Sequence, residues 1–283
     1  MTDATLRRQR LSFASATMRI FDLSLPQMLW SRRSVFLALV TGGPVVLALL
    51  IRAIVAARPA GALQVNGAAP SGAALYGMIV WLLYIRFIVP VLGVFYGTAL
   101  IADEVDDKTI TYLFTRPIPR GSVLAGKYLA YLVCTILLVL PSVVIDYFIV
   151  VPLGGRAGIG ENFPALIKDL GMLAVGLAAY GAVFALVGAR LRRPLVVGLV
   201  FAFGWEPGVM LFPGYVKRLT VAYYLQGLVP HAMPDESAVS AILQFFSETP
   251  TIVASLTALA LITAGALWFA ARAVERREYV LDQ

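Results

Sequence analysis

Residues 123–151 run VLAGKYLAYLVCTILLVLPSVVIDYFIVV, with Lys127 and Asp146 as the charged side chains and Pro141 in the interior. About 20 consecutive, mostly apolar residues suffice for a helix to cross the hydrocarbon core of a bilayer. This run is longer than that and is too apolar to form the surface of a soluble domain. It predicts a transmembrane helix, and the rest of the chain is best understood around it.

The composition of the whole chain agrees with a membrane protein. Of its 283 residues, 60% are hydrophobic and 14% are charged, whereas a soluble domain carries about 25% charged residues. This excludes an ordinary soluble enzyme and a disordered chain. With one cysteine, Cys134, and one histidine, His231, the chain has no disulfide framework, and we expect no metal site.

Five further apolar segments resemble the first, so we predict an all-α polytopic membrane protein with six transmembrane helices. The predicted spans are residues 35–57, 74–101, 123–151, 170–187, 195–212 and 252–271. Gly42-Gly43-Pro44 interrupts the first span. In domain terms, residues 1–34 form a basic cytoplasmic N-terminus and residues 35–283 form the six-span domain. Within the N-terminus, residues 18–30 have amphipathic character and predict an interfacial helix, broken at Pro26.

The distribution of basic residues predicts the topology. Sixteen of the 23 Lys and Arg residues fall at the N-terminus, at 102–127, at 189–194 or at the C-terminus, and six fall in the alternate segments. Cytoplasmic segments carry the excess of Lys and Arg. We therefore expect both termini and a loop at 102–122 on the cytoplasmic side, and a longer loop at 213–250 on the outside.

The loop at 102–122 has a pattern that the membrane does not require. Four acidic residues, Asp103, Glu104, Asp106 and Asp107, precede an apolar set and then Pro117 and Pro119. Acids suit the first turn of a short helix, and prolines end it in a rigid turn. We interpret the loop as a docking surface for a partner; the alternative is a charged loop that only satisfies the positive-inside rule.

A near match to a phosphate-binding loop lies at residues 121–128, GSVLAGKY. Tyr128 replaces the Ser or Thr whose hydroxyl would bind magnesium, and the segment leads into a membrane span rather than from a strand into a helix. We therefore expect no nucleotide site here, no catalytic residues and no cofactor on this chain.

Three ionisable residues fall inside the predicted spans, where a charge needs a partner or a polar environment. By helical rise, Arg86 lies about 24 Å and Glu206 about 16 Å from the inner edge, so the two side chains could nearly meet. Asp146 lies about 34 Å up, beyond the roughly 30 Å core, and we expect it to be solvated.

The span at 195–212 contains Glu206-Pro207-Gly208 and should not be one straight helix. In one interpretation the break faces the interior, with Arg86 as the partner of Glu206. In the other, the helix ends early, and Trp205, Glu206 and Pro207 belong to an outer gate.

These residues together resemble the ABC-2 type transporter permeases. The resemblance rests on Glu104, Thr109 and Leu113, then on Arg116-Pro117-Ile118-Pro119-Arg120, then on Gly126-Lys127 at the start of the third span. Trp205-Glu206, Pro213-Gly214-Tyr215 and Tyr223-Tyr224-Leu225 resemble a subfamily linked to maturation of nitrous-oxide reductase and other multicopper enzymes.

The resemblance implies a permease dimer in a prokaryotic inner membrane, with two copies of a separate cytoplasmic ATPase that holds ATP and Mg. It makes Glu104, Thr109, Leu113, Arg116, Pro117, Arg120 and Lys127 candidates for contact with that ATPase. The expected function is export of a lipid-like or other small substrate. Alternatives are an ion-coupled secondary transporter that uses Arg86, Asp146 and Glu206, or an intramembrane enzyme, for which no Ser/His or Asp/Asp constellation is present at span depth.

Overall fold

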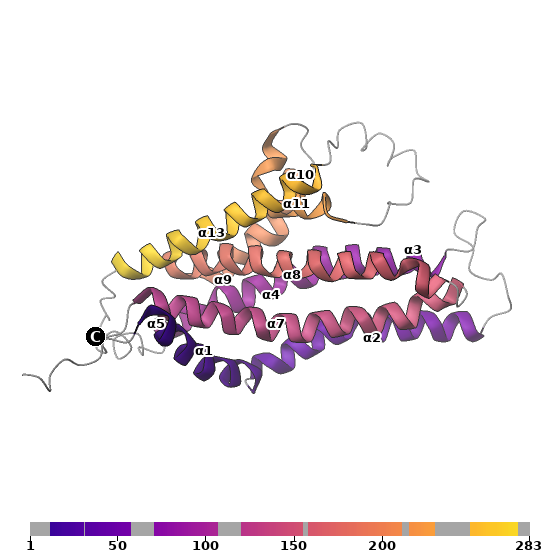
Figure 1. Cartoon of the computed structure of the whole chain (residues 1–283), viewed down its shortest axis with the longest axis horizontal. Helices are drawn as coiled ribbons and strands as arrows, with labels where there is room; N and C mark the ends of the chain where they lie inside the picture. Colours follow the sequence, from indigo (N-terminus) through magenta and orange to yellow (C-terminus); the bar gives the residue numbers. More distant parts are fainter. Residues whose placement is uncertain are drawn as a thin grey trace, which may run out of the picture.

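The structure is a computed structural model that describes residues 12–30, 32–57, 71–106, 120–154, 158–210, 215–229 and 250–276. Within these residues the regular elements are all helices. They form an elongated bundle of long helices with a group of short helices at one side (Figure 1). The predicted all-α fold class is confirmed.

Five helices of the described chain are long and apolar enough to cross a membrane: Ser34–Ala57, Gly72–Asp103, Gly121–Leu153, Gly158–Arg190 and Ile252–Glu275. The remaining predicted span, 195–212, corresponds to a shorter apolar helix, Pro194–Val209. By helical rise this shorter helix is about 24 Å long, which is less than the roughly 30 Å core of a bilayer. It is therefore too short to span the bilayer as a straight helix, unlike the five long helices.

The long helices divide into named elements. They are α2 (Arg32–Ala57), α3 (Gly72–Ile79), η1 (Val80–Ile88), α4 (Val89–Leu92), η2 (Gly93–Gly97), α5 (Ala99–Asp106), α7 (Arg120–Val150), η3 (Val151–Gly154), α8 (Gly158–Arg190) and α13 (Ile252–Arg276). The span from α3 to α5 contains two π-helical stretches, η1 and η2. Helix α2 continues through Pro44 without interruption, so the break predicted there is wrong.

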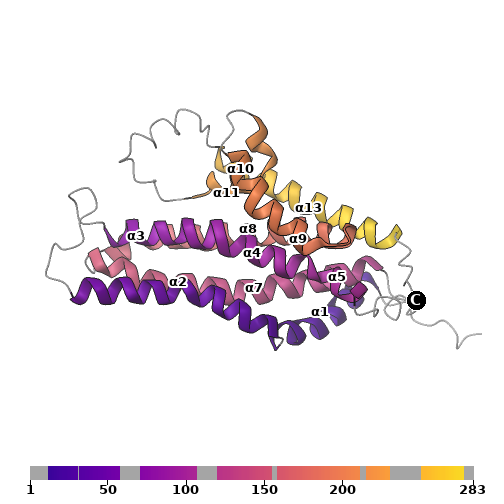
Figure 2. The same cartoon turned by 180° about the vertical axis from the view of Figure 1, so that it is seen from behind.

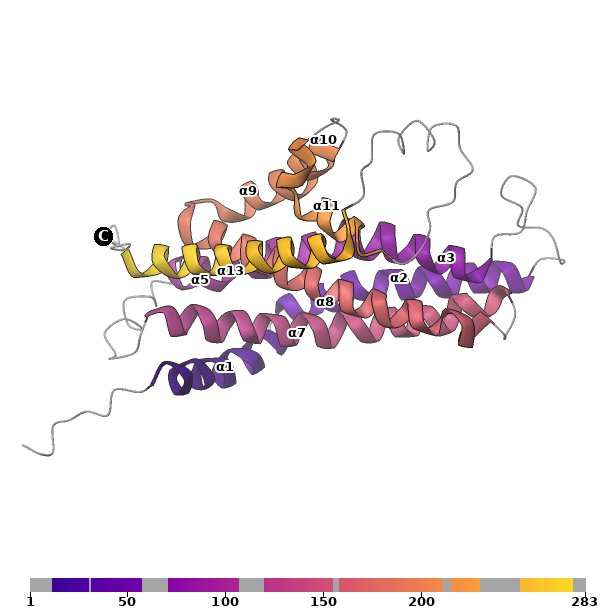
Figure 3. The same ribbon diagram turned by 45° about the horizontal axis from the view of Figure 1, so that its top comes forward.

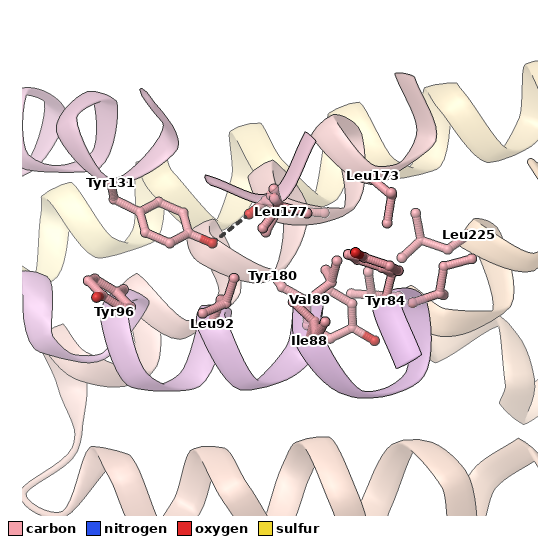
Figure 4. Close-up of a cluster of buried hydrophobic side chains, with 14 of the residues drawn as sticks. Tyr84, Ile88, Val89, Leu92, Tyr96, Tyr131, Leu173, Leu177, Tyr180 and Leu225 are labelled. Atoms are coloured by element: carbon pink, nitrogen blue, oxygen red, sulfur yellow. Dashed lines mark hydrogen bonds between the residues drawn. The ribbon is translucent and has the colours of Figure 1, made fainter. Parts of the chain in front are cut away.

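Helix α8 is the centre of the bundle. It packs against α7, α13 and the α3–α5 span; the last of these lies behind α8 in Figure 1 and in front of it in Figure 2. Figure 4 shows the core between them, where Tyr131 of α7 donates to the carbonyl oxygen of Leu177 at 2.9 Å. Large buried tyrosines such as Tyr84 and Tyr180 fill this core.

The first helix, α1 (Phe13–Leu29), lies along the start of α7. Ser12 caps it by accepting from the N–H of Ser15 at 3.3 Å, and Pro26 lies inside the helix instead of breaking it as predicted. A Cβ on Gly126 would lie 2.7 Å from the Thr17 carbonyl oxygen and 2.8 Å from Ile20 Cβ. Gly126 therefore lets the two helices approach closely, so α1 is part of the bundle as well as amphipathic.

The two ends of the bundle have different neighbours. At one end, a Cβ on Gly121 would lie 3.6 Å from the Phe13 ring and 3.6 Å from the Glu275 carboxylate. The starts of α1 and α7 and the end of α13 therefore meet there, on the left in Figure 1. At the other end, Arg52 of α2 donates to the Ile149 carbonyl oxygen of α7 at 3.1 Å.

The short helices form a separate layer beside α8 and α13. They are α9 (Pro194–Val200), η4 (Phe201–Trp205), α10 (Glu206–Met210), η5 (Tyr215–Leu219) and α11 (Val221–Gln226). Figure 3 shows α9 and α10 rising away from the long helices and α11 lying between α10 and the bundle. Helix α11 contacts α8, α13 and η1, so part of the predicted outer loop at 213–250 is packed on the core.

The packing of α8 against α7 gives a direct stability prediction. A Cβ at Gly181 would overlap the ring of Tyr131, whereas Gly171 of the same helix has open space around it. We expect Gly181→Ala to lower the free energy of unfolding by about 1–3 kcal/mol through overpacking, and Gly171→Ala to leave it unchanged or raise it slightly. Thermal unfolding of the detergent-solubilised protein measures both. Equal unfolding temperatures for the two variants would contradict the close approach.

Candidate functional site

The carboxylate of Glu206 joins three helices inside the protein. It is the first residue of α10 and is 3% exposed. One carboxylate oxygen accepts a hydrogen bond from the Tyr180 hydroxyl of α8. The other accepts from the main-chain N–H of Val221 at 3.0 Å, and the N–H of Ala222 also donates to the carboxylate. We call Glu206, Tyr180, Val221 and Ala222 the Glu206 cluster.

The local sequence explains why Glu206 reaches this position. Pro207 has no N–H, so it cannot donate to the carbonyl one turn before it. The residues just before it form the π-helical segment η4, Phe201–Trp205, as is frequent where a helix ladder is disturbed. The predicted departure from a straight α-helix is therefore present, as a π-helical stretch followed by α10.

The other half of the cluster is the N-terminus of α11. Thr220 is its N-cap, and its hydroxyl oxygen accepts from the N–H of Tyr223 at 3.4 Å. The N–H groups of Val221 and Ala222, which have no partner within a helix, point to Glu206. A carboxylate at a helix N-terminus is further favoured by the helix dipole.

Arg86 is not the direct partner of Glu206, so the pairing predicted from depth is wrong in its geometry. No ion pair joins them in the part of the chain that the structure describes. The Arg86 guanidinium lies over the Trp81 ring, 4.7 Å from its centroid, while Tyr180, Val221 and Ala222 take up the Glu206 oxygens. Arg86 is half-buried and interacts with Tyr180 and Glu206 through longer-range electrostatics.

The remaining gate candidates, Trp205 and Pro207, differ in how far they are buried. Trp205 ends η4 with 48% of its surface exposed, so it does not join the buried Glu206 cluster. Pro207 is the second residue of α10 and is half-buried. The interior interpretation of Glu206 therefore fits better than a position at the outer surface, and a gating role for these residues stays a prediction.

A second buried acid, Asp146, lies in α7 and has no exposed surface. The predicted solvation of Asp146 is wrong because neighbouring helices extend past its level and cover it. Its Oδ2 lies 2.7 Å from the Tyr84 hydroxyl of η1, and that hydroxyl lies 2.9 Å from Ser142 Oγ. Ser142 in turn donates to the Val139 carbonyl at 2.8 Å.

Sequence reasoning missed a third buried acid, Asp169. The fourth span was expected to begin at residue 170, but α8 begins at Gly158, so Asp169 lies inside the helix with no exposed surface. It interacts with Tyr76 of α3. Each buried acid thus has a tyrosine beside it, and the missed signal was the number of tyrosines within the apolar segments.

Of the residues expected to contact an ATPase, those that the structure describes lie near the end of the bundle where α1, α7 and α13 meet. Glu104 lies in α5 and Arg120 begins α7, while the half-buried Lys127 lies about two turns further along α7. Thr109, Leu113, Arg116 and Pro117 fall outside the described residues. The structure thus gives the two helices that flank this loop but not the loop's own contacts.

Comparison with protein families supplies the assignment. Residues 8–274 match the model of the ABC-2 family transporter protein family. The chain belongs to the ABC-2 transporter permease family. The match covers every described helix except the last residues of α13. No curated protein matches the chain in a sequence comparison.

As an ABC-2 permease, the chain is a membrane subunit of a transporter and is not itself the catalytic subunit. This agrees with the resemblance seen in the sequence; the narrower subfamily stays a prediction. Neither the family match nor the sequence assigns a role to the Glu206 cluster or to the buried Tyr84–Asp146 pair.

The Glu206 cluster makes a stability prediction. Glu206→Leu leaves the Tyr180 hydroxyl and the α11 N–H groups without an acceptor, and each unsatisfied buried donor costs about 1–3 kcal/mol. We expect a loss of about 3 kcal/mol or more in the free energy of unfolding, and a smaller loss for Glu206→Gln, which retains one oxygen. Glu161→Leu, at an exposed carboxylate of α8, is the control and should change it by about 0.5 kcal/mol or less.

Double variants separate the partners of Glu206. Combined with Glu206→Leu, Tyr180→Phe should add little further loss because both remove the same hydrogen bond. Arg86→Gln combined with Glu206→Leu should be closer to additive. A large coupling with Arg86 and none with Tyr180 would contradict the assignment of the cluster.

Proposed function

We propose that this permease moves a lipid-like or other small substrate outward across the membrane, driven by ATP hydrolysis on a separate cytoplasmic ABC ATPase. The family match supports a transport subunit. The observation that carries the proposal is the meeting of α1, α7 and α13 at the end of the bundle where α5 and α7 flank the charged loop at 102–122. We place the ATPase there.

The charge at this end supports that placement. The described helices that reach this end carry both signs of charge: Arg19 lies in α1, Glu104 lies in α5, and Arg190 ends α8, which contacts α5. A surface with both signs of charge steers and selects a protein partner through complementary potentials. Orientation with both termini in the cytoplasm, in the inner membrane of a prokaryote, follows from the excess of Lys and Arg on this side.

We propose that the substrate path lies beside the π-helical segments. Phe87 of η1 and Phe203 of η4 are in contact, with ring centroids 6.0 Å apart, and the half-buried Arg86 lies on the same segment as Phe87. Irregular helix is tolerated at membrane depth where protein or a water-lined cavity satisfies the backbone. We propose that η1 and η4 move against each other during transport. We also propose that this chain forms one copy of a permease dimer.

An ion-coupled mechanism has less support. It would require Arg86, Asp146 and Glu206 to act in a common site, yet in the described residues their hydrogen-bond partners are separate. Asp146 contacts Tyr84, while Glu206 contacts Tyr180 and Val221. The proposal therefore stays with an ATP-driven permease.

Purification of the tagged permease from its native membranes tests the docking of the ATPase. We expect an ABC ATPase subunit to co-purify with the wild-type chain. Glu104→Lys combined with Arg116→Glu should reduce its recovery about tenfold or more, equivalent to about 1.4 kcal/mol of binding free energy. Quantitative mass spectrometry of the eluate measures the ratio of the two subunits.

The matched control is Glu161→Lys combined with Lys168→Glu. It reverses an equal number of charges near the start of α8, at the opposite end of the bundle, and should leave recovery unchanged. Equal loss in both double variants, or no loss in either, would contradict docking at residues 102–122.

A further inference from the structure

The Asp146 carboxyl group is buried without a cation. It has no exposed surface, and it makes no ion pair in the part of the chain that the structure describes. Arg52 of α2 donates to the carbonyl oxygen of Ile149, three residues after Asp146 on α7. An ionised carboxylate in an apolar interior is strongly disfavoured unless it is paired and fully hydrogen-bonded.

Among the described residues, the groups that interact with Asp146 from neighbouring helices are tyrosine hydroxyls. Tyr84 of η1 contacts it directly. Tyr76 of α3 interacts electrostatically with Asp146, with Tyr84 and with Asp169 of α8. Within the described residues these surroundings supply hydroxyl groups and no cation, so they do not compensate a charge on Asp146.

Counting protons along the hydrogen-bonded chain identifies the form of the acid. This series of hydrogen bonds has three contacts: Asp146 to Tyr84 at 2.7 Å, Tyr84 to Ser142 at 2.9 Å and Ser142 to the Val139 carbonyl at 2.8 Å. Each contact needs one proton, and each hydroxyl supplies one. Ser142 donates to Val139 and Tyr84 donates to Ser142, so the remaining proton, between Asp146 and Tyr84, must come from the carboxyl group.

The second oxygen of Asp146 agrees with this count. Oδ1 is buried and has no hydrogen-bond partner. A carbonyl oxygen of a neutral acid without a partner is less costly than a bare carboxylate oxygen in the same place. Glu206 provides the internal contrast: the Tyr180 hydroxyl and two main-chain N–H groups all donate to it, which fits an acceptor-only, ionised carboxylate.

We propose that Asp146 is a proton-binding site within the membrane domain. Its carboxyl group is held as the neutral acid and donates its own proton to the Tyr84 hydroxyl, which continues the chain to Ser142 and Val139. Because Tyr84 belongs to η1 and the other groups belong to α7, retention of this proton is linked to the packing of η1 against α7. Separation of the two helices removes the acceptor of the proton.

Infrared spectroscopy of the purified full-length permease in neutral lipid nanodiscs at pH 7 tests this directly. A protonated carboxyl group gives a C=O stretching band that carboxylates lack. We expect such a C=O band, and we expect its frequency to shift on transfer to D₂O and on incorporation of aspartate labelled with ¹³C at the side-chain carboxyl carbon. The labelled wild-type chain provides this result even where a variant fails to fold.

Variants assign the band. Asp146→Asn should abolish it, whereas Glu206→Gln and Asp169→Asn should leave it. Tyr84→Phe should keep the acid but shift its band to higher frequency, because the acceptor is lost. The proposal is overturned if the labelled wild-type chain shows no such band at pH 7, if the band survives Asp146→Asn, or if Tyr84→Phe leaves its frequency unchanged.

Discussion

The carboxylate of Glu206 is the constraint that shapes one side of this permease. A charge buried among apolar helices has to be satisfied by donors from protein, and here the donors come from α8 and from the N-terminus of α11. Satisfying one carboxylate therefore fixes three helices relative to one another. The layer formed by α9, η4, α10 and α11 lacks a helix long enough to span the membrane, and this contact attaches it to the central helix.

Tyrosine is the side chain that makes such contacts possible in this bundle. Its ring packs with apolar neighbours while its hydroxyl reaches a polar partner, as Tyr76, Tyr84 and Tyr180 do beside the three buried acids (Figure 4 labels the last two). The number of donors around each acid then differs. Glu206 accepts from Tyr180 and from two main-chain N–H groups, whereas Asp146 contacts one hydroxyl, that of Tyr84, which also contacts Ser142. This difference is the basis for proposing that Asp146 is neutral.

The sequence predicted the fold through the features that depend on a single helix. Length and hydropathy identify every long helix, and the loop pattern around Arg116 and Gly126 indicates the family that the comparison confirms. Gly126 also has a physical role that the motif alone does not reveal: it admits α1 against α7. The contacts between helices could not be predicted from the hydropathy and motif patterns of single helices.

The candidate site shows this limit most clearly. Depth arithmetic placed Arg86 and Glu206 about 8 Å apart in height, close enough for the side chains nearly to meet, but height does not specify which side of a helix faces which neighbour. Arg86 stacks on Trp81, five residues earlier on its own helix. The partner of the Glu206 carboxylate is instead Tyr180, which the sequence did not distinguish from other core residues. Asp146 was assigned to solvent because the lengths of the surrounding helices, which cover it, were underestimated.

Hydrogen exchange at the start of α11 tests the central role of Glu206 most directly. In the wild-type permease, the amides of Val221 and Ala222 should exchange slowly because the Glu206 carboxylate accepts from both. In Glu206→Gln they should exchange markedly faster, while the Leu177 amide in α8 keeps its wild-type rate. Fast exchange at Val221 in the wild-type chain, or an unchanged rate in Glu206→Gln, would contradict a carboxylate that fixes α11 to the bundle.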